Sequence, residues 1–291
     1  MNNLELVVNF HMTEACNYRC DYCYAIWDTD CHSKEIHSIE GAVEALIDEL
    51  ACYFFSDNPL QESMRYERVR LNFAGGEPML LGKRLAEALL YAKRKGFSTS
   101  IITNGAFLDD ERLTELAAYI DVLGVSFDSA DPITAQTIGR VDRKGGWISG
   151  SKLAHIASMY RLLNPLGIFK VNTVVNEHNY RESLVEVMKE VNPDKWKVLR
   201  VLPVLGHIKP VTNIGFNDFV NRHAMLSHIW VVEDNNDMQG SYLMVNPEGC
   251  FYQNSPDELG YITSDAIVDV GAGKAFEQIS FDTKTFLSRY T

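Results

Sequence analysis

The chain has 291 residues, of which 46% are hydrophobic and 11% aromatic, and its formal net charge is −12. This composition supports a folded core and argues against disorder. An acidic surface repels the nucleic-acid backbone, which disfavours DNA or RNA as a partner. No apolar run reaches the roughly 18 residues of a membrane helix, and the start MNNLELVVNF lacks a signal pattern. We therefore expect a cytoplasmic, monomeric protein that does not bind membranes.

Strands and helices alternate along most of the chain. Short apolar runs predict strands over residues 4–12, 69–74, 98–103, 121–128, 167–175 and 196–204. Amphipathic runs predict helices over residues 38–55, 83–95, 109–119, 148–163, 180–190 and 216–228. This alternation predicts βαβ units and a parallel sheet. The expected fold class is α/β, as a partial (β/α)6 barrel.

The last part of the chain has a different pattern. The segments SYLMV, CFYQN and AIVDV predict short strands, and FEQI and KTFLSR predict short helical pieces. We expect residues 1–205 to form the barrel core and residues 206–291 to form an extension that covers its open side, within one domain overall.

Three cysteines follow the first predicted strand with the spacing C-x3-C-x2-C, at Cys16, Cys20 and Cys23. Clustered cysteines in a reducing compartment bind metal or act in chemistry more often than they form disulfides. Three thiolates suit an iron–sulfur cluster in which one iron has no protein ligand. The alternative is a zinc site completed by His11 or His32.

The other cysteines are isolated in the sequence. Cys52 falls on an apolar helix and is expected in the core, whereas Cys31 and Cys250 lack the paired spacing of a second cluster. We therefore expect one cluster.

Further polar motifs also follow predicted strands. Gly75-Gly76-Glu77-Pro78 follow the second strand, Asn104-Gly105 follow the third, and Ser126 and Asp128 end the fourth. In parallel α/β folds, ligands bind at the carboxyl ends of the strands. We expect these motifs and the cysteines to form one site.

Three predicted strands carry a polar pair at alternate positions, which places each pair on one face. The pairs are Arg70 with Asn72, Lys170 with Asn172, and Lys195 with Lys197. A cation flanked by apolar residues is costly unless it meets an anion, and phosphate is the obvious candidate. Alternatively, the lysines point outward between helices and are solvated.

The cysteine spacing together with GGEP resembles the radical S-adenosylmethionine (SAM) superfamily. The resemblance implies a [4Fe-4S] cluster on Cys16, Cys20 and Cys23 whose open iron binds SAM. It also implies an external electron donor of the flavodoxin or ferredoxin type. The reduced cluster would cleave SAM to a 5′-deoxyadenosyl radical, so that the cofactor carries the hard chemistry.

A closer resemblance covers residues 7 to 288. In order along the chain, the segments that resemble the viperin family are NFHMTEACNYRCDYCYA, LNFAGGEP, ITNG, SFDS…IGR, FKVNTVVN, PDKWKV, MQGSYLMV and IVDVGAGKAFEQISFDTKTFL. Viperins are antiviral nucleotide dehydratases. The resemblance implies conversion of a ribonucleoside triphosphate to its 3′-deoxy-3′,4′-didehydro analogue, through abstraction of the C4′ hydrogen and loss of the 3′-hydroxyl as water.

The viperin resemblance also implies roles for individual residues. The residues implied to contact SAM are Tyr22, Gly75, Gly76, Glu77, Asn104, Ser126 and Arg140. Those implied to hold the triphosphate or sugar are Arg70, Asn72, Lys170, Asn172, Lys195 and Lys197. Tyr242 would lie near the ribose and supply a hydrogen atom or proton, or alternatively pack in the lid.

The sequence departs from animal viperins in several places. It starts at the first strand, without their amphipathic membrane helix, so we expect a viperin of the prokaryotic type that acts against phage. Ala74 replaces a serine, and the chain ends at SRYT without their longer tail. The segment around Glu233–Met238, where base contacts are expected, also differs, which leaves cytosine, uracil and guanine open.

Two other classes of function stand beside this one. One is a radical SAM enzyme that acts in peptide modification or cofactor maturation, although such enzymes usually add cysteine-rich C-terminal domains. The other is a zinc-binding interaction protein without catalysis. The cations on the strands disfavour both.

Overall fold

The computed structural model describes residues 4–23, 34–205, 208–254 and 260–289. The chain divides into two compact units. Unit 1 comprises Met1–Ala15, Ala25–Ile101 and Gln239–Thr291, and unit 2 comprises Cys16–Tyr24 and Ile102–Met238. The predicted boundary at residue 205 stays a prediction.

The strands and helices have the following bounds. The strands are β1 (Glu5–His11), β2 (Arg68–Ala74), β3 (Ser98–Thr103), β4 (Val122–Ser126), β5 (Ile168–Val175), β6 (Lys195–Arg200), β7 (Trp230–Glu233), β8 (Leu243–Val245), β9 (Cys250–Asn254) and β10 (Tyr261–Ala266). The helices are α1 (Ala42–Phe54), α2 (Pro59–Met64), α3 (Lys83–Arg94), α4 (Asp110–Leu116), α5 (Pro132–Ile138), α6 (Gly150–Leu163), α7 (Val185–Val191), α8 (Asn213–Arg222), α9 (Asn235–Met238), α10 (Ile267–Val270), α11 (Ala272–Phe276) and α12 (Thr283–Ser288).

In unit 1 the strand order is β10-β9-β8-β1-β2-β3. Strand β1 is parallel to β2 and to β8, whereas β9 is antiparallel to both β8 and β10. The C-terminal strands therefore extend the sheet at β1. Helix α1 packs against α11 and β9, where the rings of Tyr53 and Phe276 and those of Phe54 and Phe251 are in contact.

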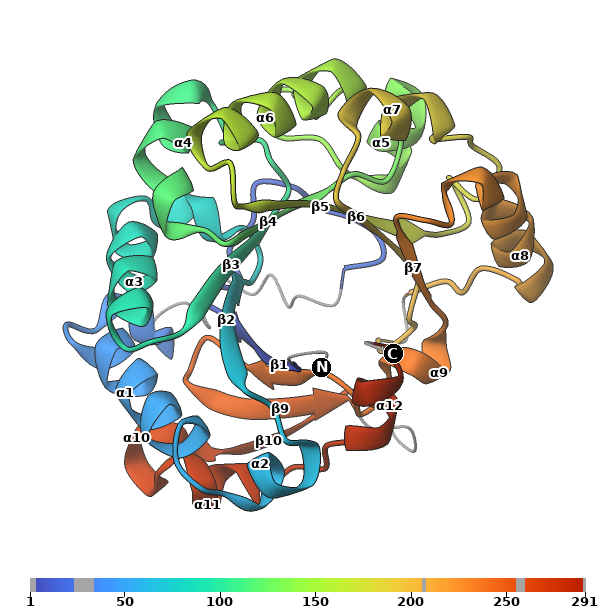
Figure 1. Cartoon of the computed structure of the whole chain (residues 1–291). Coiled ribbons are helices and arrows are strands. Elements are labelled where there is room, and N and C mark those ends of the chain that lie inside the picture. Colours follow the sequence, from blue (N-terminus) through green and yellow to red (C-terminus); the bar gives the residue numbers. More distant parts are fainter. Residues whose placement is uncertain (1–3, 24–33, 206–207, 255–259, 290–291) are drawn as a thin grey trace. The chain divides into compact units, whose positions relative to one another are not determined.

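In unit 2 the strands β4-β5-β6-β7 are all parallel. One face of this sheet is covered by helices, because Phe169 of β5 contacts Tyr160 of α6, and Trp196 of β6 contacts Phe219 of α8. Figure 1 shows α4, α6 and α7 on the outer side of β4 to β6. The other face carries Ser126, Lys170, Asn172, Lys195 and Lys197.

Capping residues fix the ends of the helices in unit 2. Asp109, Asp131 and Ser149 are the N-caps of α4, α5 and α6, and each side chain accepts a hydrogen bond from the backbone N–H three residues later. Helix α5 ends at Gly139, which adopts φ +84° in the left-handed region that glycine favours. This glycine sets the path of the chain beside the cysteines.

The predicted alternation of strands and helices up to residue 200 is confirmed to within a few residues at most boundaries. The short elements α2, α5 and β7 were not predicted. The prediction of a strand over AIVDV is wrong, since residues 267–270 form α10 and the neighbouring strand is β10. Among the described residues, no helix is both long and apolar enough to cross a membrane.

The prediction of a core position for Cys52 is also wrong, because its side chain is exposed. Helix α1 buries Val43, Leu46, Ile47, Leu50 and Phe54. These residues repeat every three or four positions along one face. Cys52 is two residues beyond Leu50 and therefore points away from that face.

Candidate active site

The three cysteines of the motif lie on one loop at the start of unit 2. Cys20 is buried, and Cys16 and Cys23 are half-buried. The loop is fixed to the end of α5, since Arg19 N donates to the carbonyl of Gly139 at 3.1 Å and Asp21 N donates to that of Ile138 at 2.9 Å. A Cβ at Gly139 would collide with the carbonyl of Arg19. Only glycine therefore allows this close approach.

Nitrogen donors lie near the sulfur atoms of Cys16 and Cys20. Cys16 Sγ accepts from Tyr18 N at 3.4 Å and from Asn104 Nδ2 at 3.8 Å, and Cys20 Sγ accepts from Arg140 Nη1 at 3.9 Å. Such hydrogen bonds set the reduction potential of iron–sulfur clusters. Burial raises the pKa of the Cys20 thiol to about 11, so a metal is needed to hold it as a thiolate at neutral pH. Three thiols with these donors fit an iron–sulfur cluster.

Asn104 is held beside the cysteine loop. Its Oδ1 accepts from Ala106 N at 2.9 Å, while Nδ2 donates to Asn17 Oδ1 at 2.7 Å and to Cys16 Sγ. In unit 2, Asn104 therefore lies near the cysteines, as expected.

A buried polar network connects the cysteine loop to β4. The Tyr22 hydroxyl donates to Asp128 Oδ2, and Arg140 Nη1 lies 3.3 Å from the same oxygen. Arg140 Nη2 also donates to the carbonyl of Ser126 at 2.7 Å. Burial, reinforced by Asp128, raises the pKa of Tyr22 well above its usual value. Burial opposes the charge of Arg140, but the neighbouring groups, Asp128 foremost, outweigh this effect and raise its pKa well above its usual value. The guanidinium is therefore charged.

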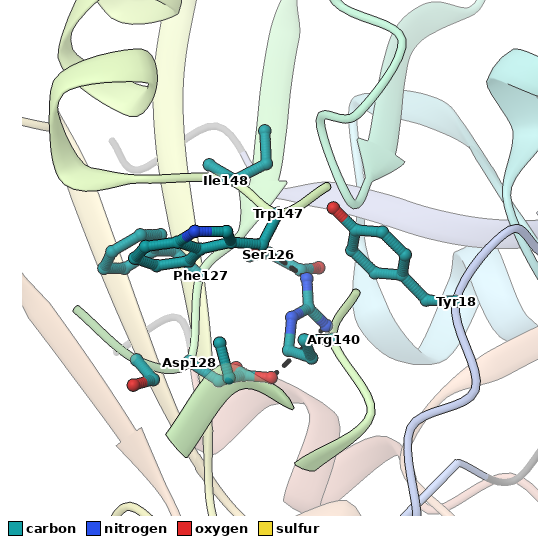
Figure 2. Close-up of a pocket in the computed structure, with 9 residues that line it drawn as sticks. Tyr18, Ser126, Phe127, Asp128, Arg140, Trp147 and Ile148 are labelled. Carbon is teal, nitrogen blue, oxygen red and sulfur yellow. Dashed lines mark hydrogen bonds and ion pairs between the residues drawn. The ribbon is translucent and has the colours of Figure 1, made fainter. Parts of the chain in front are cut away.

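A pocket opens beside this network. Figure 2 shows Ser126, Asp128 and Arg140 together with Tyr18 and Trp147 around it. Three aromatic rings and two aliphatic side chains line the pocket along with polar groups, a mixed lining of the kind that small-molecule sites have.

The glycine motif lies in unit 1. Gly76 N donates to the carbonyl of Thr13 at 2.6 Å, and Glu77 N donates to that of Ala15 at 2.8 Å. A Cβ at Gly76 would collide with the carbonyls of Ala15 and Glu14. The close approach of Gly76 that the structure shows is to residues 13–15 of the chain itself, and the implied contact of Gly75 and Gly76 with SAM stays a prediction. Glu77 is fully buried and accepts from Met79 N at 3.1 Å.

The lysines of unit 2 lie in register on neighbouring strands. Ser126 of β4 pairs with Asn172 of β5, which pairs with Lys197 of β6. Lys170 and Lys195 form the row two residues earlier. Asn172 is buried, Lys170 and Lys197 are half-buried, and Lys195 is exposed at the first residue of its strand.

These lysines lie on the face that the helices do not cover. Because side chains alternate along a strand, Lys170 points away from the side of Phe169, and Lys197 points away from the side of Trp196, which the helices cover. Lys197 Nζ lies 2.6 Å from Glu233 Oε1 at the end of β7. The sequence analysis did not anticipate this carboxylate.

The polar pair of β2 belongs to unit 1. Arg70 Nε lies 3.3 Å from Glu5 Oε2, a further carboxylate that was not anticipated. Asn72 donates from Nδ2 to Asn9 Oδ1 at 2.9 Å and accepts from Ser100 Oγ at 2.6 Å. Arg70 and Lys197 therefore each pair with a carboxylate of the chain. Because these carboxylates offset the cost of burying the two cations, burial alone is not evidence for a bound phosphate.

Tyr242 directly precedes β8, and its ring makes a cation–π contact. The guanidinium of Arg289 stands 4.2 Å from the centre of the Tyr242 ring and donates to the carbonyl of Ser241. Within unit 1, the structure thus places an arginine that the sequence analysis missed against the predicted catalytic tyrosine.

The zinc alternative named two histidines. The ring of His11 is buried, and its Nδ1 lies 2.7 Å from the Tyr252 hydroxyl. His32 and Cys31 lie outside the described residues. Cys250 is buried in β9, where burial raises the pKa of its thiol to about 11.

Comparisons with known proteins identify the class of protein. The radical SAM superfamily model matches residues 10–191. The solved structure "Native anSMEcpe with bound AdoMet" has the same fold, with a TM-score of 0.61 and 18% identity over 96% of this chain and 84% of that one. The chain is therefore a member of the radical SAM superfamily, and the predicted fold class is confirmed.

Full-length relatives narrow the class further. The S-adenosylmethionine-dependent nucleotide dehydratase of Pseudoalteromonas ulvae is 48% identical over 98% of this chain and 93% of its own length. That of Psychrobacter lutiphocae is 38% identical over 99% and 95%, and the protein of Oncorhynchus mykiss named S-adenosylmethionine-dependent nucleotide dehydratase RSAD2 is 30% identical over 97% and 78%. The chain belongs to this family of viperin-like nucleotide dehydratases, which implies SAM and a [4Fe-4S] cluster as cofactors.

Proposed function

We propose that this enzyme converts a ribonucleoside triphosphate, CTP, UTP or GTP, to its 3′-deoxy-3′,4′-didehydro analogue, and that the product serves in defence against phage. The names of the relatives support a nucleotide as substrate. The observation that carries the proposal is the row Ser126–Asn172–Lys197 across β4, β5 and β6. In this row, Ser126, which we expect to bind SAM, and Lys197, which we expect to bind phosphate, lie on neighbouring parts of one sheet.

The cofactors are assigned to the motif residues. Cys16, Cys20 and Cys23 would hold the cluster. The remaining contacts to SAM would come from Tyr22, Gly75, Gly76, Glu77, Asn104, Ser126 and Arg140. When bound and reduced by an external flavodoxin or ferredoxin, the cluster and SAM supply a 5′-deoxyadenosyl radical that removes a hydrogen atom. The aromatic lining of the pocket beside Arg140 would exclude water from that chemistry.

The substrate is assigned to the polar strand faces. Lys170 and Lys197 would bind the triphosphate, and Lys195 would add to the positive field from the exposed end of β6. Arg70 would contribute a further cation, and Asn72 and Asn172 would orient phosphate or sugar. For Lys197, binding requires that phosphate compete with Glu233 for the ammonium group, which a multiply charged anion does better than a neutral nucleoside.

The overall reaction balances as a dehydration. The nucleotide gives up its C4′ hydrogen atom, the 3′-hydroxyl leaves with a proton as water, and one electron from the external donor completes the 3′,4′ double bond. Tyr242 would stand near the ribose and supply the proton through its hydroxyl. The Arg289 guanidinium over its ring would hold the ring in place through a cation–π contact.

The test is an anaerobic assay with reconstituted enzyme, SAM, dithionite and one of CTP, UTP, GTP or ATP at a time. The expected result is a burst of 5′-deoxyadenosine with one base, together with a nucleotide lighter by one water in the mass spectrum. Slow formation of 5′-deoxyadenosine that does not depend on nucleotide would reject the triphosphate substrate. It would favour a radical SAM enzyme acting on a peptide or a cofactor precursor.

A further inference from the structure

The carboxylate of Asp128 is the centre of the network beside the cysteine loop. Its side chain is 1% exposed, and it follows β4 by two residues. Oδ1 accepts a hydrogen bond from Val174 N of β5 at 2.8 Å, and Oδ2 accepts one from the Tyr22 hydroxyl. The backbone carbonyl of Asp128 accepts from Asn179 Nδ2 at 2.8 Å. Both the main chain and the side chain are therefore fixed.

This fixed carboxylate determines where Arg140 lies. Oδ2 is 3.3 Å from Arg140 Nη1, and the other terminal nitrogen, Nη2, is held by the carbonyl of Ser126 at 2.7 Å. The two contacts hold the plane of the guanidinium at two points, as Figure 2 shows. Nη1 then also reaches Cys20 Sγ at 3.9 Å. The guanidinium borders the pocket on one side and a motif cysteine on the other.

The negative charge of Asp128 compensates the positive charge of a buried arginine. A buried guanidinium is costly without an opposite charge, and Arg140 is only 11% exposed. An amide in place of the carboxylate would keep the shape but remove the counter-charge. Arg140 would then gain by turning toward solvent or toward another acceptor.

We propose that Asp128 is a positioning residue for the cofactor: its carboxylate fixes the guanidinium of Arg140 beside Cys20 and the pocket, and thereby supports SAM binding without contacting SAM. The inference rests on the proposed assignment of Arg140 to SAM. It concerns a residue that the sequence analysis placed at the end of a strand without a role.

The experiment compares four reconstituted variants with the unmodified enzyme. Asp128→Asn removes the charge, Arg140→Met removes the guanidinium, and the double variant removes both. Glu182→Gln is the matched control, because Glu182 accepts from Ser129 Oγ at 2.7 Å and Ala130 N at 3.1 Å in the loop that follows Asp128. The measurements are iron content, the midpoint of thermal unfolding, the Kd for SAM by equilibrium dialysis, and the change in the EPR spectrum of the reduced cluster on addition of SAM.

The expected result is that Asp128→Asn keeps its iron but raises the Kd for SAM about tenfold, the size of one lost charge-assisted contact. The SAM-dependent EPR change should require correspondingly more SAM. The double variant should bind SAM as Arg140→Met does, because Asp128 acts through Arg140 and the two effects do not add. Glu182→Gln should bind SAM normally.

An unchanged Kd in Asp128→Asn would overturn the proposal. So would a double variant that binds much more weakly than Arg140→Met, and this comparison holds even if Asp128→Asn alone does not fold. A normal Kd in Arg140→Met would instead reject the assignment of Arg140 to SAM. None of these outcomes depends on which nucleotide the enzyme uses.

Discussion

The ammonium group of Lys197 lies 2.6 Å from Oε1 of Glu233, and the two side chains are 15% and 3% exposed. They come from the neighbouring parallel strands β6 and β7, on which Leu199 pairs with Glu233. Lys197 lies in the row that carries the proposed phosphate site. It therefore carries both a structural and a functional prediction.

Lys197→Met should lower the free energy of unfolding by about 3–5 kcal/mol, because it removes the positive charge beside a buried carboxylate. Lys195→Met, on the same strand face but exposed, should cost less than about 1 kcal/mol. Urea unfolding of the cluster-free protein measures both values. Equal losses in the two variants would show that the ion pair does not stabilise the sheet.

Lys170→Ala should weaken nucleotide use while leaving the cluster intact. It removes a charge-assisted contact to phosphate of about 1.5–3 kcal/mol, so the KM for the triphosphate should rise on the order of ten- to a hundredfold. Iron content and nucleotide-independent cleavage of SAM should not change. Lys189→Ala, an exposed lysine paired with Glu186 on α7, is the control. Normal turnover of nucleotide by Lys170→Ala would refute the proposed phosphate site.

Gly139→Ala should disturb the cysteine loop. Alanine is strained at φ +84°, and its Cβ would collide with the carbonyl of Arg19. We expect iron content after reconstitution to fall severalfold together with the unfolding midpoint. Gly273→Ala is the control, since a Cβ there meets only Tyr53 side-chain atoms at 3.4 Å. Full iron loading of Gly139→Ala would show that the loop does not need this contact.

His11 should make folding stability depend on pH. Burial lowers the pKa of its imidazole from 6.5 to about 4. Between these two pH values, the unfolded chain binds a proton that the folded chain does not. Stability should therefore fall as pH drops through this window, by up to about 3 kcal/mol, and this contribution should be constant above pH 6.5.

The measurement is urea unfolding of the cluster-free protein between about pH 4 and pH 8, a range that spans both protonation steps, compared with His11→Gln. The variant should lack this part of the pH dependence, whereas His155→Gln, at an exposed site, should retain it. Parallel pH profiles for His11→Gln and the unmodified chain would contradict the prediction.

The elements that could be predicted are those with a local signal. Short apolar runs predicted β5 and β6, and the spacing of the cysteines and of GGEP predicted the two motif loops. The strand predicted over AIVDV failed because only Ile267 of α10 is buried, so the segment has no buried face of period two. The prediction for Cys52 failed because the buried face of α1 is narrower than the apolar run suggested.

The contacts that were missed depend on partners distant in the sequence. Tyr22 and Asp128 are 106 residues apart, and nothing in the SFDS segment shows that its aspartate meets an arginine and a tyrosine. Glu233 finds Lys197 only through the pairing of β6 with β7. Gly139 was predicted as part of the IGR motif, although its fit against Arg19 could be seen only in three dimensions.

The most direct test of the central claim uses a ribonucleoside triphosphate that carries deuterium at C4′. After one anaerobic turnover with SAM and reductant, the masses of 5′-deoxyadenosine and of the nucleotide are measured. We predict that 5′-deoxyadenosine becomes heavier by one mass unit, and that the nucleotide loses the deuterium together with its 3′-hydroxyl. Unlabelled 5′-deoxyadenosine alongside an intact, fully deuterated nucleotide would contradict the assignment of this chain to triphosphate dehydration.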